Sequence, residues 1–204
     1  MSPLFRKRSD ASETKSTTTD TTAGTQPEAA SSTTASEPEW FLPEDARGQL
    51  TKLFAALQQP VRLEVFTRQG ENDVYNDYLT QFVRDVARLS PKIEAGFHDV
   101  AGDLGTKYGV QASPTLLVNP ETCHVRFRGA PLGEEGRAFV ETLLRASLGD
   151  SGLSSQSRQI YAALDTPRQI RVFVNPGCPY CPGQVVHAFK AAMERPDLIQ
   201  AESV

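Results

Sequence analysis

The sequence predicts an α/β protein in which a mixed β-sheet is flanked by helices. Segments with apolar residues at every second position alternate along the chain with longer segments whose apolar residues recur at helical spacing. A helical segment connects the first two strand segments, so those strands should run parallel. A short connection that contains residues 119–122 joins the next two strands, which should therefore form an antiparallel hairpin.

The N-terminal residues 1–39 lack the composition of a folded segment. Of residues 1–38, 16 are Ser or Thr, and from Arg6 to Pro38 there is no Val, Ile, Leu, Met or aromatic residue. Such a segment buries too little apolar area to offset the entropy lost on ordering. We predict a disordered tail over residues 1–39, with order beginning near Trp40.

A first folded unit is expected over residues 40–150. Pro60 ends its first helix, because the residue before a proline is disfavoured in helical conformation. Gly149 ends its last helix, as a C-terminal glycine commonly does. Between them the pattern predicts strands and helices in the order strand 61–65, helix 74–86, strand 92–100, short helix 102–109, strand 115–118, strand 125–127 and helix 134–148.

A second unit, over residues 151–204, begins the same pattern again. A short helix precedes Pro167, and residues 170–174 alternate as a strand. The turn Asn175-Pro176-Gly177 follows, and an amphipathic helix then runs to Pro196. A further strand is expected near residues 198–204. This unit holds far fewer elements than the first.

Composition offers no electrostatic case for a nucleic-acid partner or an anionic membrane surface. The chain has 25 acidic and 21 basic residues, for a net charge of −4. The cluster Arg6-Lys7-Arg8 is followed by no apolar stretch, so it begins neither a signal peptide nor a membrane span. A cytoplasmic location is expected. No glycine-rich dinucleotide motif occurs, so no bound cofactor is expected beyond a redox-active disulfide.

The residues with the clearest chemistry are Cys178-Pro179-Tyr180-Cys181, between a predicted strand and a predicted helix. Two cysteines three apart, in a chain with too few cysteines for a secreted disulfide framework, indicate redox catalysis or metal binding. At a helix N-terminus, Cys178 is the expected nucleophile, because the helix dipole favours its anion and lowers a free pKa of about 8.5. Cys181, one turn inside, is suited to resolving the mixed disulfide. Pro179 fits an early helical position.

Zinc binding is an alternative use of the two cysteines. A structural zinc site takes four ligands, usually from two such pairs. Only Cys123, His124 and His187 remain to complete the set, and His187 is more simply a partly exposed helix residue. A purely structural dithiol is the other alternative.

Several other side chains have a simpler structural interpretation. Cys123 is expected to be a small, partly buried apolar residue. His98 and His124 have no acid or nucleophile nearby in the sequence and are most simply strand or loop residues. Tyr180 is expected to be an exposed loop aromatic. A helical stripe is expected to be core rather than a cofactor site, namely Val74, Tyr78 and Phe82.

With these motifs in place, the chain resembles two families of tandem thioredoxin-fold proteins. The Cys178-Pro179-Tyr180-Cys181 motif is similar to the glutaredoxin-type active site. The chain is similar to the N-terminal domain of the F component of alkyl hydroperoxide reductase, because a first unit without cysteines at its redox position contains the stretch 126–133 and is followed by the dithiol unit. Residues 173–177 with the dithiol and Pro182 equally resemble the glutaredoxin-like protein disulfide oxidoreductases. The likeness covers about residues 40–204.

The resemblance implies two tandem thioredoxin-fold units, the first without redox activity because residues 67–73 contain no thiol. It implies that Cys178 attacks and Cys181 resolves, with Pro179 and Tyr180 completing the motif. The resemblance of Tyr180 to the tyrosine of glutaredoxin-type sites implies that it presses on a bound substrate thiol. Pro114 matches the family's cis-proline, but it lies in the first unit. The implied partners are a flavoprotein donor of the thioredoxin-reductase type and a protein disulfide as acceptor, with a peroxiredoxin suggested by the first likeness.

The second unit departs from the family pattern in its length. The 89 residues from Pro60 to Leu148 would correspond to only 37 from Arg168 to Val204, so the second unit is expected to be incomplete and the chain a fragment or a truncated product. An exposed sheet edge is expected as a result. The main hypothesis is a dithiol oxidoreductase or electron-transfer module. The alternatives are a non-enzymatic interaction module and, third, a zinc-site protein.

Overall fold

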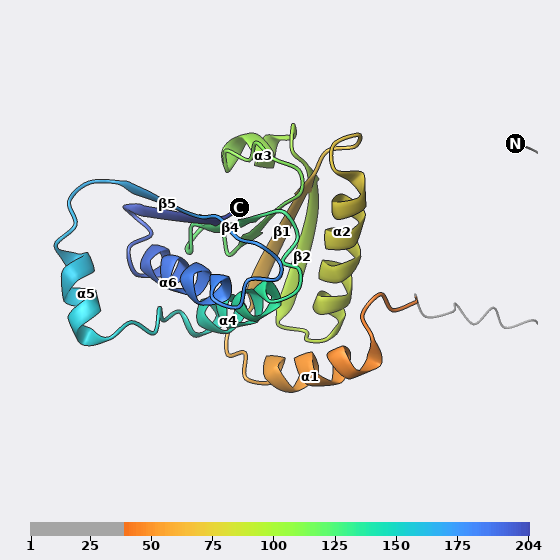
Figure 1. The fold of residues 1–204 in the computed structure, drawn as a ribbon, viewed down its shortest axis with the longest axis horizontal. Coiled ribbons are helices and arrows are strands. Elements are labelled where there is room, and N and C mark those ends of the chain that lie inside the picture. Colours follow the sequence, from red (N-terminus) through yellow and green to blue (C-terminus); the bar gives the residue numbers. More distant parts are fainter. Residues whose placement is uncertain (1–38) are drawn as a thin grey trace, which may run out of the picture. The chain divides into compact units, whose positions relative to one another are not determined.

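The computed structural model describes residues 39–204, so the predicted disordered tail lies outside the described residues except for Glu39. None of the helices described is long and apolar enough to cross a membrane. In chain order the elements are α1 (Glu44–Phe54), β1 (Val61–Thr67), α2 (Asp73–Arg88), β2 (Ile93–Asp99), α3 (Asp103–Lys107), β3 (Thr115–Val118), β4 (Val125–Arg128), α4 (Glu135–Leu148), α5 (Ser155–Ala162), β5 (Arg168–Val172), α6 (Cys181–Glu194) and β6 (Ile199–Ser203) (Figure 1).

The strands form one mixed sheet, in the order β2-β1-β3-β4-β6-β5. β1 and β2 are parallel, and β3 and β4 form an antiparallel hairpin, so both pairings predicted from connection length are confirmed. β1 pairs with β3 antiparallel, while β6 runs parallel to both β4 and β5. The β4–β6 pairing was not predicted. It joins the strands of the two predicted units in a single sheet.

The helices divide between the two faces of the sheet. One face packs a large core with α1, α2, α4 and α6, and the other packs a smaller core with α3. The strand residues alternate accordingly: Leu63 and Val65 of β1 belong to the large core, whereas Phe66 belongs to the small one. Helices α4 and α6 lie side by side on the large-core face (Figure 1). The helix that follows the dithiol is thereby held against the first unit.

Aromatic contacts connect α6 to the rest of the core. The ring of Phe127, on β4, lies 6.1 Å from that of Phe139 on α4 and 5.0 Å from that of Phe189 on α6. All three side chains are buried. Aromatic pairs in such edge-on arrangements add to the stabilisation from burial. Phe127 therefore links the two helices that flank the candidate site.

The predicted boundaries and core stripes need three corrections. The strand predicted over 170–174 is β5, over Arg168–Val172, although the N–H of Val174 still donates to the carbonyl of Val204. The first helix ends at Phe54, well before Pro60. Val74 is not core, because its side chain is 79% exposed. Residues spaced by four advance about 40° around a helix at each step, so Val74 lies roughly 80° away from Phe82.

We predict that Phe189→Ala destabilises the protein by about 3–5 kcal/mol, because a buried ring is lost and a cavity remains. The free energy of unfolding is measured by urea denaturation. The matched control is Phe173→Ala, since Phe173 is exposed and its loss should cost no more than about 0.5 kcal/mol. Equal effects of the two substitutions would contradict the placement of α6 in the shared core.

Candidate dithiol site

We define the dithiol loop as residues 173–181, which connect β5 to α6 and include Cys181, the first residue of that helix. Both cysteines lie in its second half. Asn175 organises this loop. Its carbonyl accepts a hydrogen bond from the N–H of Cys178 at 2.9 Å, and its side-chain oxygen accepts one from the N–H of Gly177 at 3.0 Å. Asn commonly forms such turns with its own side chain. The backbone just before Cys178 is therefore held by local hydrogen bonds.

Cys178 and Cys181 form a disulfide, with their Cα atoms 5.5 Å apart. Both residues are partly exposed, so neither cysteine is fully buried. The backbone N–H of Cys181 donates a hydrogen bond to Sγ of Cys178 at 3.2 Å. A donor aimed at this sulfur favours its anionic form once the disulfide is reduced. This contact distinguishes the two cysteines, because the hydrogen bond is to Sγ of Cys178.

The helix begins later than the sequence indicated. Tyr180 is the N-cap and Cys181 the first residue of α6, so Cys178 precedes the helix and Cys181 does not lie one turn inside it. Pro179 is likewise outside the helix, and Pro182 takes the early helical position expected of Pro179.

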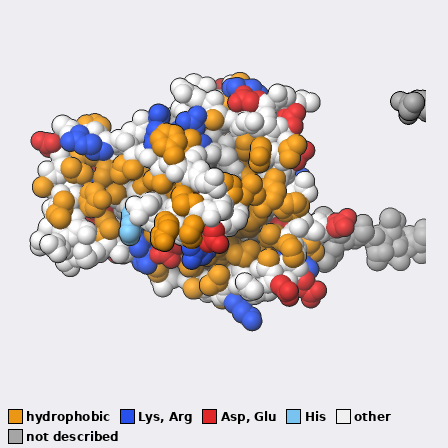
Figure 2. Space-filling model, viewed as in Figure 1, with side chains coloured by type: hydrophobic (Ala, Val, Ile, Leu, Met, Phe, Trp, Pro, Cys, Tyr) orange, Lys and Arg blue, Asp and Glu red, His pale blue; other side chains and the backbone are white. Residues whose placement is uncertain are grey.

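Two aromatic side chains of the dithiol loop face solvent. Tyr180 is 81% exposed and Phe173 is 74% exposed. Hydrophobic side chains also gather on the molecular surface in the view of Figure 2. Tyr180 stands next to the disulfide in sequence and is available to a molecule that approaches it.

The first turn of α4 contacts the dithiol loop at two points. The backbone N–H of Glu134 donates to the carbonyl of Pro176 at 3.4 Å, and Nη2 of Arg137 donates to the carbonyl of Pro179 at 3.4 Å. Gly133 packs so closely that a Cβ there would lie 2.7 Å from the oxygen of Pro176, and its φ of +55° also favours glycine. Sequence reasoning missed these contacts because 42 residues separate Arg137 from Pro179.

Glu135 is a second residue that the sequence did not single out. Its carboxylate accepts a hydrogen bond from the hydroxyl of Ser203, at the end of β6. Burial raises the pKa of the Glu135 carboxyl, and the hydrogen bond from Ser203 opposes that shift. A glutamate in the first turn of a helix usually faces solvent. The pairing of β6 with β4 is what brings Ser203 beside it.

The peptide bond between Ser113 and Pro114, just before β3, is cis. Pro114 is the residue that the sequence matched to the family's cis-proline. Ser113 lies against the thiol-free turn of the first unit: its hydroxyl accepts from the N–H of Arg68 at 2.6 Å and donates to Oδ1 of Asn76 at 2.8 Å. The side-chain amide of Asn72 donates to the Ser113 carbonyl at 2.8 Å. Hydrogen bonds between polar groups therefore connect this turn to the Pro114 loop.

The third cysteine and the three histidines lie outside the dithiol loop. Cys123 is free and buried, and burial raises the pKa of its thiol. His98 does have an acidic partner, since its Nε2 lies 2.5 Å from Oε2 of the fully buried Glu64 on the neighbouring strand. His187 is exposed on α6, and His124 lies in the loop before β4. Within residues 39–204, no three or more His, Cys, Asp or Glu side chains are grouped to hold a metal ion.

The fold and the site together define a class of protein. A mixed sheet with parallel and antiparallel neighbours, a cis-proline before the antiparallel strand and a disulfide between a strand and a helix are the features of a thioredoxin-fold protein with a dithiol site. Comparison with known proteins gives the more particular likeness.

No protein-family model and no curated protein matches the sequence. Among solved structures, the chain is similar to the NTD_N/C domain of alkylhydroperoxide reductase AhpF from Enterococcus faecalis, with 25% identity, 80% of each chain covered and a TM-score of 0.71. It is also similar to a protein disulfide oxidoreductase from Aeropyrum pernix, with 26% identity, 78% of this chain and 74% of the other covered, and a TM-score of 0.70. These similarities show the thioredoxin fold and support a thiol–disulfide redox role in general.

We predict that Glu135→Gln becomes more stable relative to wild type as pH rises from about 4 to 7. The folded pKa of Glu135 lies above the unfolded value of about 4.5, so ionisation at higher pH costs the folded wild type free energy that the neutral amide does not lose. Urea unfolding at both pH values measures the difference. The matched control is Glu134→Gln, an exposed neighbour. A stability difference for Glu135→Gln that is the same at both pH values would contradict the burial of this carboxyl.

Proposed function

We propose that this chain is a thiol–disulfide oxidoreductase that works through Cys178 and Cys181. The observation that carries the proposal is the partly exposed pair of bridged sulfurs, with the Cys181 N–H directed at the sulfur of Cys178. Similarity to alkylhydroperoxide reductase and protein disulfide oxidoreductase structures supports it.

The exchange would proceed in two steps. In the reduced protein, the Cys178 thiolate attacks one sulfur of a partner disulfide, and the other partner sulfur leaves as a thiolate. Cys181 then loses its proton and attacks Sγ of Cys178, which releases the second partner thiol and re-forms the Cys178–Cys181 disulfide. Two electrons pass from the dithiol to the partner. A donor of two electrons must then reduce the protein disulfide again.

The first unit contributes to this site without a thiol of its own. Its α4 turn holds the dithiol loop at the carbonyls of Pro176 and Pro179, on either side of Cys178. A reacting group must be held in place for fast exchange, and fixed backbone is one way to achieve this. We propose that the first unit acts as the scaffold of the dithiol loop.

The proposed partners follow from the two likenesses. An electron donor of the thioredoxin-reductase type, a flavoprotein, would reduce the disulfide. The acceptor would be a disulfide in a protein, and the similarity to alkylhydroperoxide reductase AhpF favours a peroxiredoxin. Similarity to a protein disulfide oxidoreductase favours a broader set of protein disulfides.

We predict that the purified chain accelerates the reduction of insulin disulfides by dithiothreitol, and that Cys178→Ser returns the rate to that of dithiothreitol alone. The reason is that serine offers no thiolate to attack a disulfide. Turbidity from the precipitating insulin chain measures the rate. If wild type and Cys178→Ser are equally inactive, the oxidoreductase proposal fails and the non-enzymatic interaction module becomes the better account.

We predict a different result for Cys181→Ser. This variant keeps the attacking thiol but lacks the resolving one, so a mixed disulfide between Cys178 and the substrate should accumulate. Non-reducing electrophoresis and mass spectrometry after incubation with an oxidised protein detect the covalent complex. Cys178→Ser is the control and should form none. Trapping by Cys178→Ser instead would reverse the assigned roles.

A further inference from the structure

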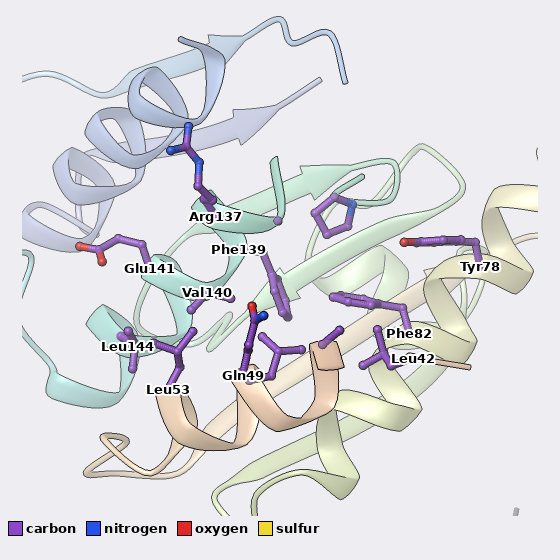
Figure 3. A pocket seen from close by; sticks show the side chains of 14 residues that line it. Leu42, Gln49, Leu53, Tyr78, Phe82, Arg137, Phe139, Val140, Glu141 and Leu144 are labelled. Carbon is purple, nitrogen blue, oxygen red and sulfur yellow. The ribbon is translucent and has the colours of Figure 1, made fainter. Parts of the chain in front are cut away.

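An apolar groove lies between α1, α2 and α4, with a volume of about 500 Å³ (Figure 3). Phe82 of α2 and Phe139 of α4 form part of its lining, with their rings 5.2 Å apart and edge-on. Leu53 of α1, also in the lining, is 45% exposed. The two rings are buried, so the apolar side chains of the lining that face water are others, such as Leu53, Val140 and Leu144. Exposed apolar side chains gathered in one concavity are typical of a binding surface. The groove is therefore able to take apolar side chains of another molecule.

The groove reaches the dithiol loop through the first turn of α4. Gly136 and Arg137 line the groove. Arg137 also donates to the carbonyl of Pro179, the residue after Cys178. A chain segment seated in the groove would therefore lie beside Arg137, whose side chain reaches the dithiol loop.

Two charged side chains line the groove, Arg137 and Glu141, and they lie one turn apart on α4. Glu141 lines the groove, but Arg145 lies 2.8 Å and Lys190 3.8 Å from its carboxylate, so its charge is compensated. Arg137 forms an ion pair with Glu134 at 3.2 Å, and the two side chains are 68% and 48% exposed. Exposed pairs of this kind contribute little free energy. Arg137 thus offers a cation that an incoming carboxylate can engage.

We propose that this groove binds the segment that flanks the disulfide of the partner protein. The segment would place apolar side chains against Leu53, Val140 and Leu144 and a carboxylate side chain at Arg137. This inference rests on the proposed function and adds to it the chemistry of the substrate: an apolar and acidic stretch next to the disulfide. The exchange itself then follows the two steps given above, with no further reactant.

Two glycines provide a matched pair of variants. A Cβ at Gly136, within α4, would meet no atom within 4 Å, so a larger side chain there extends into open space in the groove. A Cβ at Gly48, within α1, also meets nothing within 4 Å, but Gly48 is not part of the groove lining. Both positions are helical, where replacing glycine lowers the entropic cost of folding. Gly136→Leu should fill the groove, and Gly48→Leu should not.

The test compares two synthetic peptides that share one intramolecular disulfide. One carries Leu-Glu-Leu beside the disulfide, and the other carries Ser-Lys-Ser. The rate constant for oxidation of the reduced protein by each peptide is measured by stopped-flow mixing and acid quench. We expect wild type and Gly48→Leu to prefer the apolar, acidic peptide by about tenfold, equivalent to about 1.4 kcal/mol. Gly136→Leu should reduce this preference to about twofold or less.

Arg137→Gln tests the contribution of charge to peptide preference by itself. It gives a result even if Gly136→Leu fails to fold. It should lose the preference for a peptide with Glu over the same peptide with Lys, while the preference for Leu over Ser remains. Equal rates for both peptides with wild type would overturn the groove assignment but leave the dithiol function standing. A preference that survives Gly136→Leu unchanged would also overturn it. Failure of both peptides and of insulin to react would instead refute the proposed function.

Discussion

The parallel pairing of β4 with β6 is the interaction on which the site depends. Val125 is registered with Ala201 and Phe127 with Ser203, so the strand after the dithiol helix continues the sheet of the first unit. This pairing forces α6 to pack beside α4, where Phe127 contacts the aromatic rings of both helices. The first turn of α4 is then brought to the dithiol loop. Without this pairing, the two parts of the chain would share neither a sheet nor a core.

The dithiol site combines local and distant interactions. The Asn175 turn and the Cys181 N–H are local, and they set the backbone and the electrostatic surroundings of Cys178. The contacts from Gly133 and Arg137 are distant in sequence, and they hold the loop from outside. Since a reactive sulfur must be both accessible and fixed in position, each set of contacts supplies what the other cannot. The first unit thereby has a physical role although it carries no thiol in the corresponding turn.

The turn that follows the first strand is stabilised differently in the two units. In the second unit, a disulfide and an Asn175 turn occupy it. In the first, Ser113 and Asn76 connect it by hydrogen bonds to the loop of the cis-proline. The loop after β5 is thus held partly by a covalent bond, and the loop after β1 by polar contacts. The TM-scores of about 0.7 to structures that share only about a quarter of the residues reflect a general rule: a fold depends on the pattern of buried apolar residues more than on their identities.

Sequence patterns alone were enough to predict the order of helices and strands, the direction of two strand pairings and the Cys178–Cys181 pair. These features depend on the apolar period, on connection length and on neighbours within a few residues. The β4–β6 pairing, the burial of Glu135, the partner of His98 and the groove beside the dithiol loop emerged only from the folded chain. Each of these joins residues far apart in the chain. Such contacts are set by how whole elements pack, and no local pattern encodes which distant side chain will lie opposite.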